Sequence, residues 1–114
     1  MLIVDDDPGW RSLYRLEFGD RFEIVEAVDG RDGLDRLEQA RPDLVILDLR
    51  MPGMDGVWFL ACLEDRGNRT PVIVCTAVER EAPAVVRSRA RIVPKSPDLT
   101  RLREAIAAVT TAGR

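Results

Sequence analysis

The stretch VILDLRMPGMDG, residues 45 to 56, gives the clearest structural signal in the sequence. It opens with three aliphatic residues that run directly into Asp48, and a segment rich in methionine, proline and glycine follows. A short, continuous apolar run is typical of a strand that is buried on both faces of a parallel sheet. Proline and glycine do not continue such a strand. The sequence therefore predicts that the strand ends at Asp48 and that the loop after it leaves the carboxylate accessible.

Similar apolar runs recur along the chain and alternate with amphipathic stretches. They predict strands at residues 1–4, 22–25, 44–47, 72–75 and 92–93. Between them, apolar residues at helical spacing predict helices around residues 10–18, 34–37, 57–63, 82–86 and 99–109. Successive strand–helix units of this kind imply a three-layer α/β fold, in which an open parallel sheet carries helices on both faces.

The length and composition of the chain limit its class. Its 114 residues fit one ordinary domain, so we expect residues 1–114 to form a single domain with residues 110–114 frayed. The formal net charge of −3 argues against direct, non-specific binding of nucleic acid. No apolar run approaches the roughly 20 residues of a membrane span, and the chain opens with MLIVDDD instead of a signal peptide. We therefore expect a cytoplasmic protein that does not contact the membrane.

Histidine is absent from the sequence, and only two cysteines are present. The lack of histidine excludes Ser-His and Cys-His catalysis and removes the usual zinc ligands. Cys62 and Cys75 form no C-x-x-C motif, so we interpret both as reduced core thiols.

Polar residues follow the predicted strands at the points where each strand ends. The carboxyl ends of parallel strands form one edge of the sheet, where such folds bind their ligands. Several carboxylates at this edge repel one another, and a hard divalent cation among them would relieve that repulsion. Oxygen ligands without histidine or thiolate favour Mg²⁺. The residues concerned are Asp5, Asp6, Asp7, Asp48, Thr76 and Lys95.

This set of side chains is chemically complete for phosphoryl transfer to a carboxylate. An aspartate can act as a nucleophile and form an acyl phosphate, which requires a divalent ion and further groups that bind the phosphoryl oxygens. Asp48 is the candidate nucleophile, and Thr76 and Lys95 are the candidate phosphoryl contacts. Simpler explanations exist for single residues: Asp7, before Pro8, is best placed to cap a helix, and an isolated aspartate is an ordinary turn former.

Five motifs follow one another along nearly the whole chain: LIVDDDP, AVDGRDGL, PDLVILDLRMPGMDG, PVIVCTA and VPKSP. In this order they resemble the receiver domain of bacterial two-component response regulators. The resemblance implies a flavodoxin-like (βα)5 sheet with strand order 2-1-3-4-5. It also implies that Asp48 accepts a phosphoryl group from a phosphohistidine on a sensor histidine kinase or a histidine phosphotransfer protein.

The resemblance also implies a role for each residue at the site. The implied magnesium ligands are the carboxylates of Asp6 and Asp48, the backbone carbonyl of Arg50 and, mainly through water, Asp5. The implied phosphoryl-binding residues are Thr76 and Lys95, with Ala77 as the small residue that leaves room for the group.

The chain departs from the family pattern near its predicted fourth helix and fifth strand. Ile92 stands where the family usually has an aromatic residue, and Ser88-Arg89 stands where it has Gly-Ala. Proline follows Ser96 and not Lys95, so the family's common cis Lys-Pro bond is absent. These positions belong to the usual output face, and we predict that the fourth helix is short or mobile.

The leading hypothesis is a phosphorylation-controlled switch, which assists its own phosphotransfer and dephosphorylation but is not an enzyme acting on an external substrate. It would act on a downstream protein or fused output domain through its fourth helix, fifth strand and fifth helix, and homodimerisation is possible. A pseudo-receiver that binds partners without phosphate is the alternative. A phosphatase of the haloacid-dehalogenase type would need an aspartate at position 50, where Arg50 stands, and dinucleotide binding would need a G-x-G-x-x-G motif that is absent.

Overall fold

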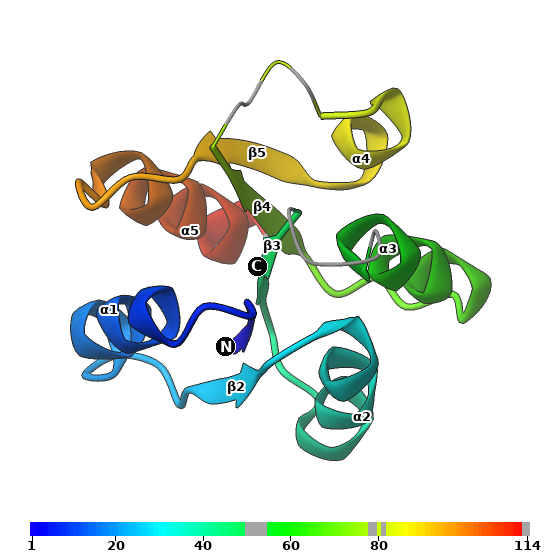
Figure 1. Cartoon of the computed structure of the whole chain (residues 1–114), viewed down its shortest axis with the longest axis horizontal. Helices are drawn as coiled ribbons and strands as arrows, with labels where there is room; N and C mark the ends of the chain where they lie inside the picture. Colours follow the sequence, from blue (N-terminus) through cyan, green and yellow to red (C-terminus); the bar gives the residue numbers. More distant parts are fainter. Residues whose placement is uncertain (50–54, 78–79, 81, 113–114) are drawn as a thin grey trace.

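The computed structural model describes residues 1–49, 55–77, 80 and 82–112. In this part of the chain, five parallel strands form one sheet with the order β2-β1-β3-β4-β5 (Figure 1). The strands are β1 (Leu2–Val4), β2 (Val25–Ala27), β3 (Val45–Asp48), β4 (Val72–Thr76) and β5 (Arg91–Pro94). The predicted three-layer, flavodoxin-like (βα)5 fold and its 2-1-3-4-5 strand order are confirmed.

The helices cover both faces of this sheet, as the connections between parallel strands require. They are α1 (Pro8–Phe18), α2 (Gly30–Ala40), α3 (Asp55–Asp65), α4 (Ala84–Arg89) and α5 (Thr100–Ala112). Helices α1 and α5 lie on one face, and α2, α3 and α4 lie on the other (Figure 1). None of the helices in the described ranges is both long enough and apolar enough to cross a membrane.

Two apolar clusters form the core, one on each face of the sheet. Side chains of a strand point alternately to the two faces, so Leu2 and Val4 join the cluster under α2 and α3, whereas Ile3 joins the cluster under α1 and α5. Each of these three residues is fully buried. This burial explains why β1, β3 and β4 are apolar up to their carboxyl ends, where the polar side chains of Asp5, Asp48 and Thr76 lie.

Gly33 allows α2 to approach the sheet closely. A Cβ atom at this position would lie 3.0 Å from the ring of Phe59 and 3.0 Å from the side chain of Val4. Both neighbours are fully buried and have little room to move. The glycine therefore sets the distance between α2, α3 and the strand that leads to Asp5.

The predicted second strand, at residues 22–25, is wrong except at Val25, because β2 runs from Val25 to Ala27. Phe22 and Ile24 are apolar because they pack against the cluster under α1 and α5, ahead of the strand. The strand itself includes Glu26, whose carboxylate pairs with Arg11 and Arg15 at 3.2 and 2.6 Å. These two guanidinium groups allow a charged residue to lie in an edge strand.

Helix α4 has only six residues and no side-chain hydrogen bond at its amino end, so the prediction that it is short is confirmed. Of the apolar residues that marked it, Val86 is buried, whereas Val85 is 58% exposed and Ala82 lies ahead of the helix. The predicted apolar stripe is therefore wrong at Val85. Ile92 is half-buried and packs against the same cluster as Val86.

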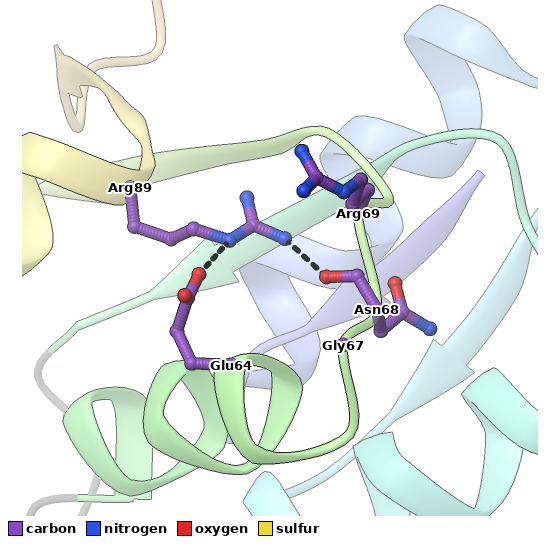
Figure 2. Close-up of a pocket in the computed structure, with 5 residues that line it drawn as sticks. All are labelled: Glu64, Gly67, Asn68, Arg69 and Arg89. Atoms are coloured by element: carbon purple, nitrogen blue, oxygen red, sulfur yellow. Dashed lines mark hydrogen bonds and ion pairs between the residues drawn. The ribbon is translucent and has the colours of Figure 1, made fainter.

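Arg89, the last residue of α4, ties this helix to the connection between α3 and β4 (Figure 2). Its guanidinium group lies 2.8 Å from a carboxylate oxygen of Glu64 and donates to the backbone carbonyls of Asn68 and Thr70 at 3.1 and 2.9 Å. A surface pocket lies beside this contact, lined by Glu64, Gly67, Asn68, Arg69 and Arg89. The pocket is at the amino ends of β4 and β5, which is the edge of the sheet opposite to the aspartates.

Candidate functional site

Asp48 is the last residue of β3 and lies at the carboxyl edge of the sheet. Its backbone is paired with Cys75 of β4, and Thr76, the next residue, is paired with Pro94 of β5. This register brings the ends of β3, β4 and β5 to the same level. Asp48 is 5% exposed and Thr76 is 2% exposed, so the two polar side chains sit in an otherwise apolar part of the sheet.

Asp5 and Asp6 come to the same place from the end of β1. One carboxylate oxygen from each of Asp5, Asp6 and Asp48 lies within 4.8 Å of the others. Asp5 is buried and Asp6 is exposed. The sequence-based expectation that the ends of β1 and β3 would bring these aspartates together is therefore met by the geometry.

Backbone contacts fix the position of Asp5. Its carboxylate accepts a hydrogen bond from the backbone N–H of Asp7 at 2.9 Å, and its backbone carbonyl accepts one from the guanidinium group of Arg11 at 2.7 Å. Sequence reasoning missed Arg11. The sequence feature that could have indicated its role is its position near the start of a predicted helix that directly follows the acidic residues. Arg11 also pairs with Glu26.

Asp7 serves the helix and not the site. Its side chain accepts a hydrogen bond from the backbone N–H of Gly9 at 2.8 Å, and Pro8 is the first residue of α1. The prediction that Asp7 is the N-cap is confirmed. Asp5 and Asp6 are thus the two members of the acidic run that face Asp48.

Lys95 bridges the two buried carboxylates. Its ammonium nitrogen lies 2.8 Å from Asp5 Oδ2 and 3.1 Å from Asp48 Oδ2, and its side chain is 11% exposed. Its backbone N–H donates to the carbonyl oxygen of Thr76 at 2.8 Å, which continues the pairing of β4 with β5 by one residue. Lys95 therefore belongs to the site through its side chain and to the sheet through its backbone.

The pKa values of these groups show the balance of charge at the site. Burial raises the pKa of Asp5 above its ordinary value of 3.8, although the hydrogen bonds from Lys95 and Asp7 act in the opposite direction. Burial alone would lower the pKa of Lys95, but the hydrogen bond to Asp5 and the charge of Asp48 outweigh it and raise this pKa above 10.5. One ammonium group thus incompletely compensates the buried negative charge.

The other predicted site residues, Thr76, Ala77 and Arg50, and the two cysteines differ from one another in burial or lie outside the described residues. Thr76 is buried at the end of β4, and Ala77, directly after it, is exposed. Arg50 lies outside the described residues, so its carbonyl has no described position. Cys62 is half-buried and Cys75 is buried as free thiols, and burial raises the pKa of Cys75 to about 12. Cys75 is thus an inert core thiol.

The residues present fit a magnesium ion. The carboxylate oxygens of Asp5, Asp6 and Asp48 converge, and among the described residues this group contains neither histidine nor cysteine. Hard oxygen donors of this kind suit Mg²⁺. The raised pKa of Asp5 indicates that the site can accept further positive charge.

Comparison with known proteins gives the family. The sequence model described as "Response regulator receiver domain" matches residues 1–107. The chain belongs to this family. It is a receiver domain of the two-component response regulators, and the resemblance seen in the sequence is confirmed.

Curated relatives of this receiver domain include the "Regulator of RpoS" of Escherichia coli, which is 37% identical over 111 residues, or 93% of this chain and 33% of that protein. The "Response regulator MprA" of Mycolicibacterium vanbaalenii is 40% identical over 78 residues, or 68% of this chain and 34% of that protein. The chain spans about a third of the length of these relatives.

Solved structures similar to this receiver domain include the response regulator TrrA of Thermotoga maritima in complex with Mg²⁺-BeF. It has a TM-score of 0.85 and 28% sequence identity, and the match covers 95% of this chain and 96% of that one. TrrA in complex with the histidine kinase ThkA is also similar, with a TM-score of 0.84, 27% identity and 95% coverage of both chains.

Proposed function

We propose that this receiver domain accepts a phosphoryl group on Asp48 from a phosphohistidine of a sensor histidine kinase or a histidine phosphotransfer protein. One observation carries the proposal: Lys95 holds Asp48 and Asp5 together at the buried ends of β3 and β1, at 3.1 and 2.8 Å. Burying two carboxylates with one ammonium group lowers the stability of the fold. The presence of this cluster therefore favours a functional role over a structural one. The complex of TrrA with a histidine kinase supports a partner of that class.

In the proposed reaction, a carboxylate oxygen of Asp48 attacks the phosphorus in line with the departing imidazole nitrogen. An O–P bond forms while the N–P bond breaks, and its electron pair returns to the imidazole of the donor. The ammonium of Lys95, already at Asp48, binds one phosphoryl oxygen, and the hydroxyl of Thr76 binds another. The exposed Ala77 leaves space beside them.

Asp5, Asp6 and Asp48 would hold Mg²⁺, together with the backbone carbonyl of Arg50 that the family resemblance implies. The ion would neutralise charge on the phosphoryl oxygens. Because Asp6 is exposed whereas Asp5 and Asp48 are buried, ions would enter from the side of Asp6.

The modified Asp48 would draw Thr76 inward and shift an existing equilibrium of the surface formed by α4, β5 and α5. We propose a downstream protein or a fused output domain as the reader of this surface. The domain would also assist its own dephosphorylation. Residues 1–114 as one domain, a cytoplasmic location and homodimerisation stay predictions. A phosphate-independent pseudo-receiver is not favoured, because the acidic residues, Thr76 and Lys95 are all at the expected strand ends.

Intact mass spectrometry tests the proposal. The chain is incubated with Mg²⁺ and either acetyl phosphate or phosphoramidate, and we expect a gain of one phosphoryl unit in the wild type. Asp48→Asn should abolish the gain, because the amide is not a nucleophile for this reaction. Asp20→Asn, an exposed aspartate in the turn after α1, is the matched control and should retain it. No gain in the wild type with either donor would contradict the proposal.

A further inference from the structure

Trp10, in the first turn of α1, is the third neighbour of the Lys95 ammonium. The ammonium nitrogen lies 5.0 Å from the centroid of the indole ring. Trp10 is half-buried, and the Lys95 side chain is 11% exposed. A cation over the face of an indole at this distance is attracted by the negative charge of the ring face. The ammonium is therefore held by two carboxylates and one aromatic ring.

The ring restricts a side chain that is otherwise flexible. Lysine carries its charge on a four-carbon stem with many rotamers, and ordering that stem costs free energy. Asp5 and Asp48 bind the ammonium through ion pairs at 2.8 and 3.1 Å. The indole ring of Trp10, whose centroid lies 5.0 Å from the same nitrogen, adds a third attraction that restricts the stem.

Trp10 is itself held in place by its surroundings. Its ring packs against Tyr14, one turn further along α1, with ring centroids 5.9 Å apart, and Tyr14 is 1% exposed and lies in the same apolar cluster as Cys75. The start of α1 is fixed by the Asp7 cap and by the bond from Arg11 to the Asp5 carbonyl. The ring and the Asp5 carboxylate thus belong to one rigid segment.

We propose that Trp10 is a positioning residue for phosphoryl transfer, whose ring holds the Lys95 ammonium between Asp5 and Asp48 so that it is in place when the phosphoryl group arrives. This inference rests on the proposed function of Asp48. The ring of Trp10 contacts the Lys95 ammonium, so we assign its effect on the reaction to that group.

The first test is the proton NMR spectrum of the Lys95 side chain, which does not depend on phosphorylation. Protons above the face of an aromatic ring are shielded, so we expect the CεH₂ protons of Lys95 to resonate upfield of those of exposed lysine. The upfield shift should disappear in Trp10→Leu and be partly retained in Trp10→Phe. Unshifted protons in a folded wild type would overturn the inference.

The second test is the rate at which phosphoramidate and Mg²⁺ add a phosphoryl unit, followed by intact mass. We expect Trp10→Leu to lower the rate on the order of 3- to 30-fold, the range that corresponds to a cation–π contact, and Trp10→Phe to recover part of it. The matched control is Trp58→Leu, because Trp58 makes the same kind of contact with Arg31, at 5.7 Å, outside the aspartate cluster. It should keep the wild-type rate.

A double-mutant cycle shows whether Trp10 acts through Lys95. In a Lys95→Met background, which lacks the ammonium, Trp10→Leu should have no further effect on the rate. An equal loss in both backgrounds, or a wild-type rate in Trp10→Leu, would overturn the inference while the proposed function stands. A wild type that gains no phosphoryl unit would overturn both.

Discussion

At the scale of single residues, the burial of Asp5 has an electrostatic cost. It is buried, close to Asp48, and stabilised by one ammonium group that both carboxylates share. Asp5 ionised in the folded state is therefore less stable than Asp5 ionised in the unfolded chain. The raised pKa of Asp5 expresses that difference.

This shift predicts the pH dependence of stability. Because the folded state binds the Asp5 proton more tightly, the contribution of Asp5 to the free energy of unfolding falls as pH rises from its ordinary pKa of 3.8 through its raised folded pKa. Asp5→Asn removes this titration. In urea unfolding without Mg²⁺, we expect the stability of the variant relative to the wild type to increase with pH across that window.

The control for this prediction is Asp20→Asn, which changes an exposed aspartate. Its stability relative to the wild type should stay nearly constant over the same pH range. If the stability of Asp5→Asn relative to the wild type instead decreased as pH rises, the prediction would be wrong. That result would mean that the attraction of Lys95 lowers the pKa of Asp5 by more than burial raises it.

The residue scale also shows what the sequence could predict of the site. Asp5, Asp6 and Asp48 were identified because the ends of parallel strands meet at one edge. The contact between Trp10 and Lys95 was not predicted, because it joins residues 85 positions apart through a helix whose rotation about its axis depends on Tyr14 and on the Asp7 cap. Helical spacing alone predicts that Trp10 lies in the helix at residues 10–18 and does not predict its contact with Lys95.

At the scale of elements, α4 is short but attached at its carboxyl end. The Arg89 side chain is 16% exposed, and its guanidinium group pairs with Glu64 and donates to the backbone carbonyls of Asn68 and Thr70. Alanine, which the family resemblance implies at this position, has no group that could make these contacts. Any movement of α4 in the switch would therefore be larger at its amino end.

We predict that Arg89→Ala lowers the free energy of unfolding by about 1.5 to 3 kcal/mol, the usual range for hydrogen bonds that involve a charged group. The matched control is Arg66→Ala, whose ion pair with Glu38 is largely exposed and should contribute less than about 1 kcal/mol. Urea unfolding measures both. Equal, small losses would mean that Arg89 does not anchor the helix, and faster amide exchange in α4 of Arg89→Ala would support the anchoring.

Strand boundaries illustrate the limits of pattern reasoning for elements. The FEIV run predicted a strand at 22–25, but apolar residues ahead of a strand can belong to the core as well. The true strand contains Glu26, and its tolerance for charge depends on Arg11 and Arg15, which come from another element. The sequence around Glu26 does not show that arginines from α1 will pair with it.

At the scale of the whole molecule, Mg²⁺ binding at the proposed site would be coupled to folding. A cation that binds only the folded state stabilises it in proportion to the logarithm of its concentration. With Mg²⁺ at about 100 times its dissociation constant, we expect about 2.7 kcal/mol of added stability, or a rise in Tm on the order of 10 °C relative to EDTA. Thermal unfolding followed by circular dichroism measures it.

The specificity of this effect has its own controls. Asp6→Asn should lose most of the rise in Tm, because it removes the exposed oxygen ligand, whereas Asp20→Asn should keep it. Potassium chloride at matched ionic strength should produce little change. A similar rise with the potassium salt, or an undiminished rise in Asp6→Asn, would contradict a magnesium site at these aspartates.

The global topology was the most predictable level of all. Apolar runs without alternation, such as those that became β3 and β4, can be buried only in a sheet covered on both faces, and that requirement implies the parallel arrangement. The strand order came from the family resemblance and not from the pattern. Residue spacing says which segments are strands, but their neighbours are decided by packing across the whole chain.

The hydrogen bond from the backbone N–H of Lys95 to the carbonyl of Thr76 joins the carboxyl ends of β4 and β5 through the main chain. An inward displacement of Thr76 would therefore also displace the backbone of Lys95, whichever side chain occupies position 92. In the proposed switch, this main-chain connection would couple Thr76 to Lys95 without an aromatic side chain at position 92, where Ile92 stands.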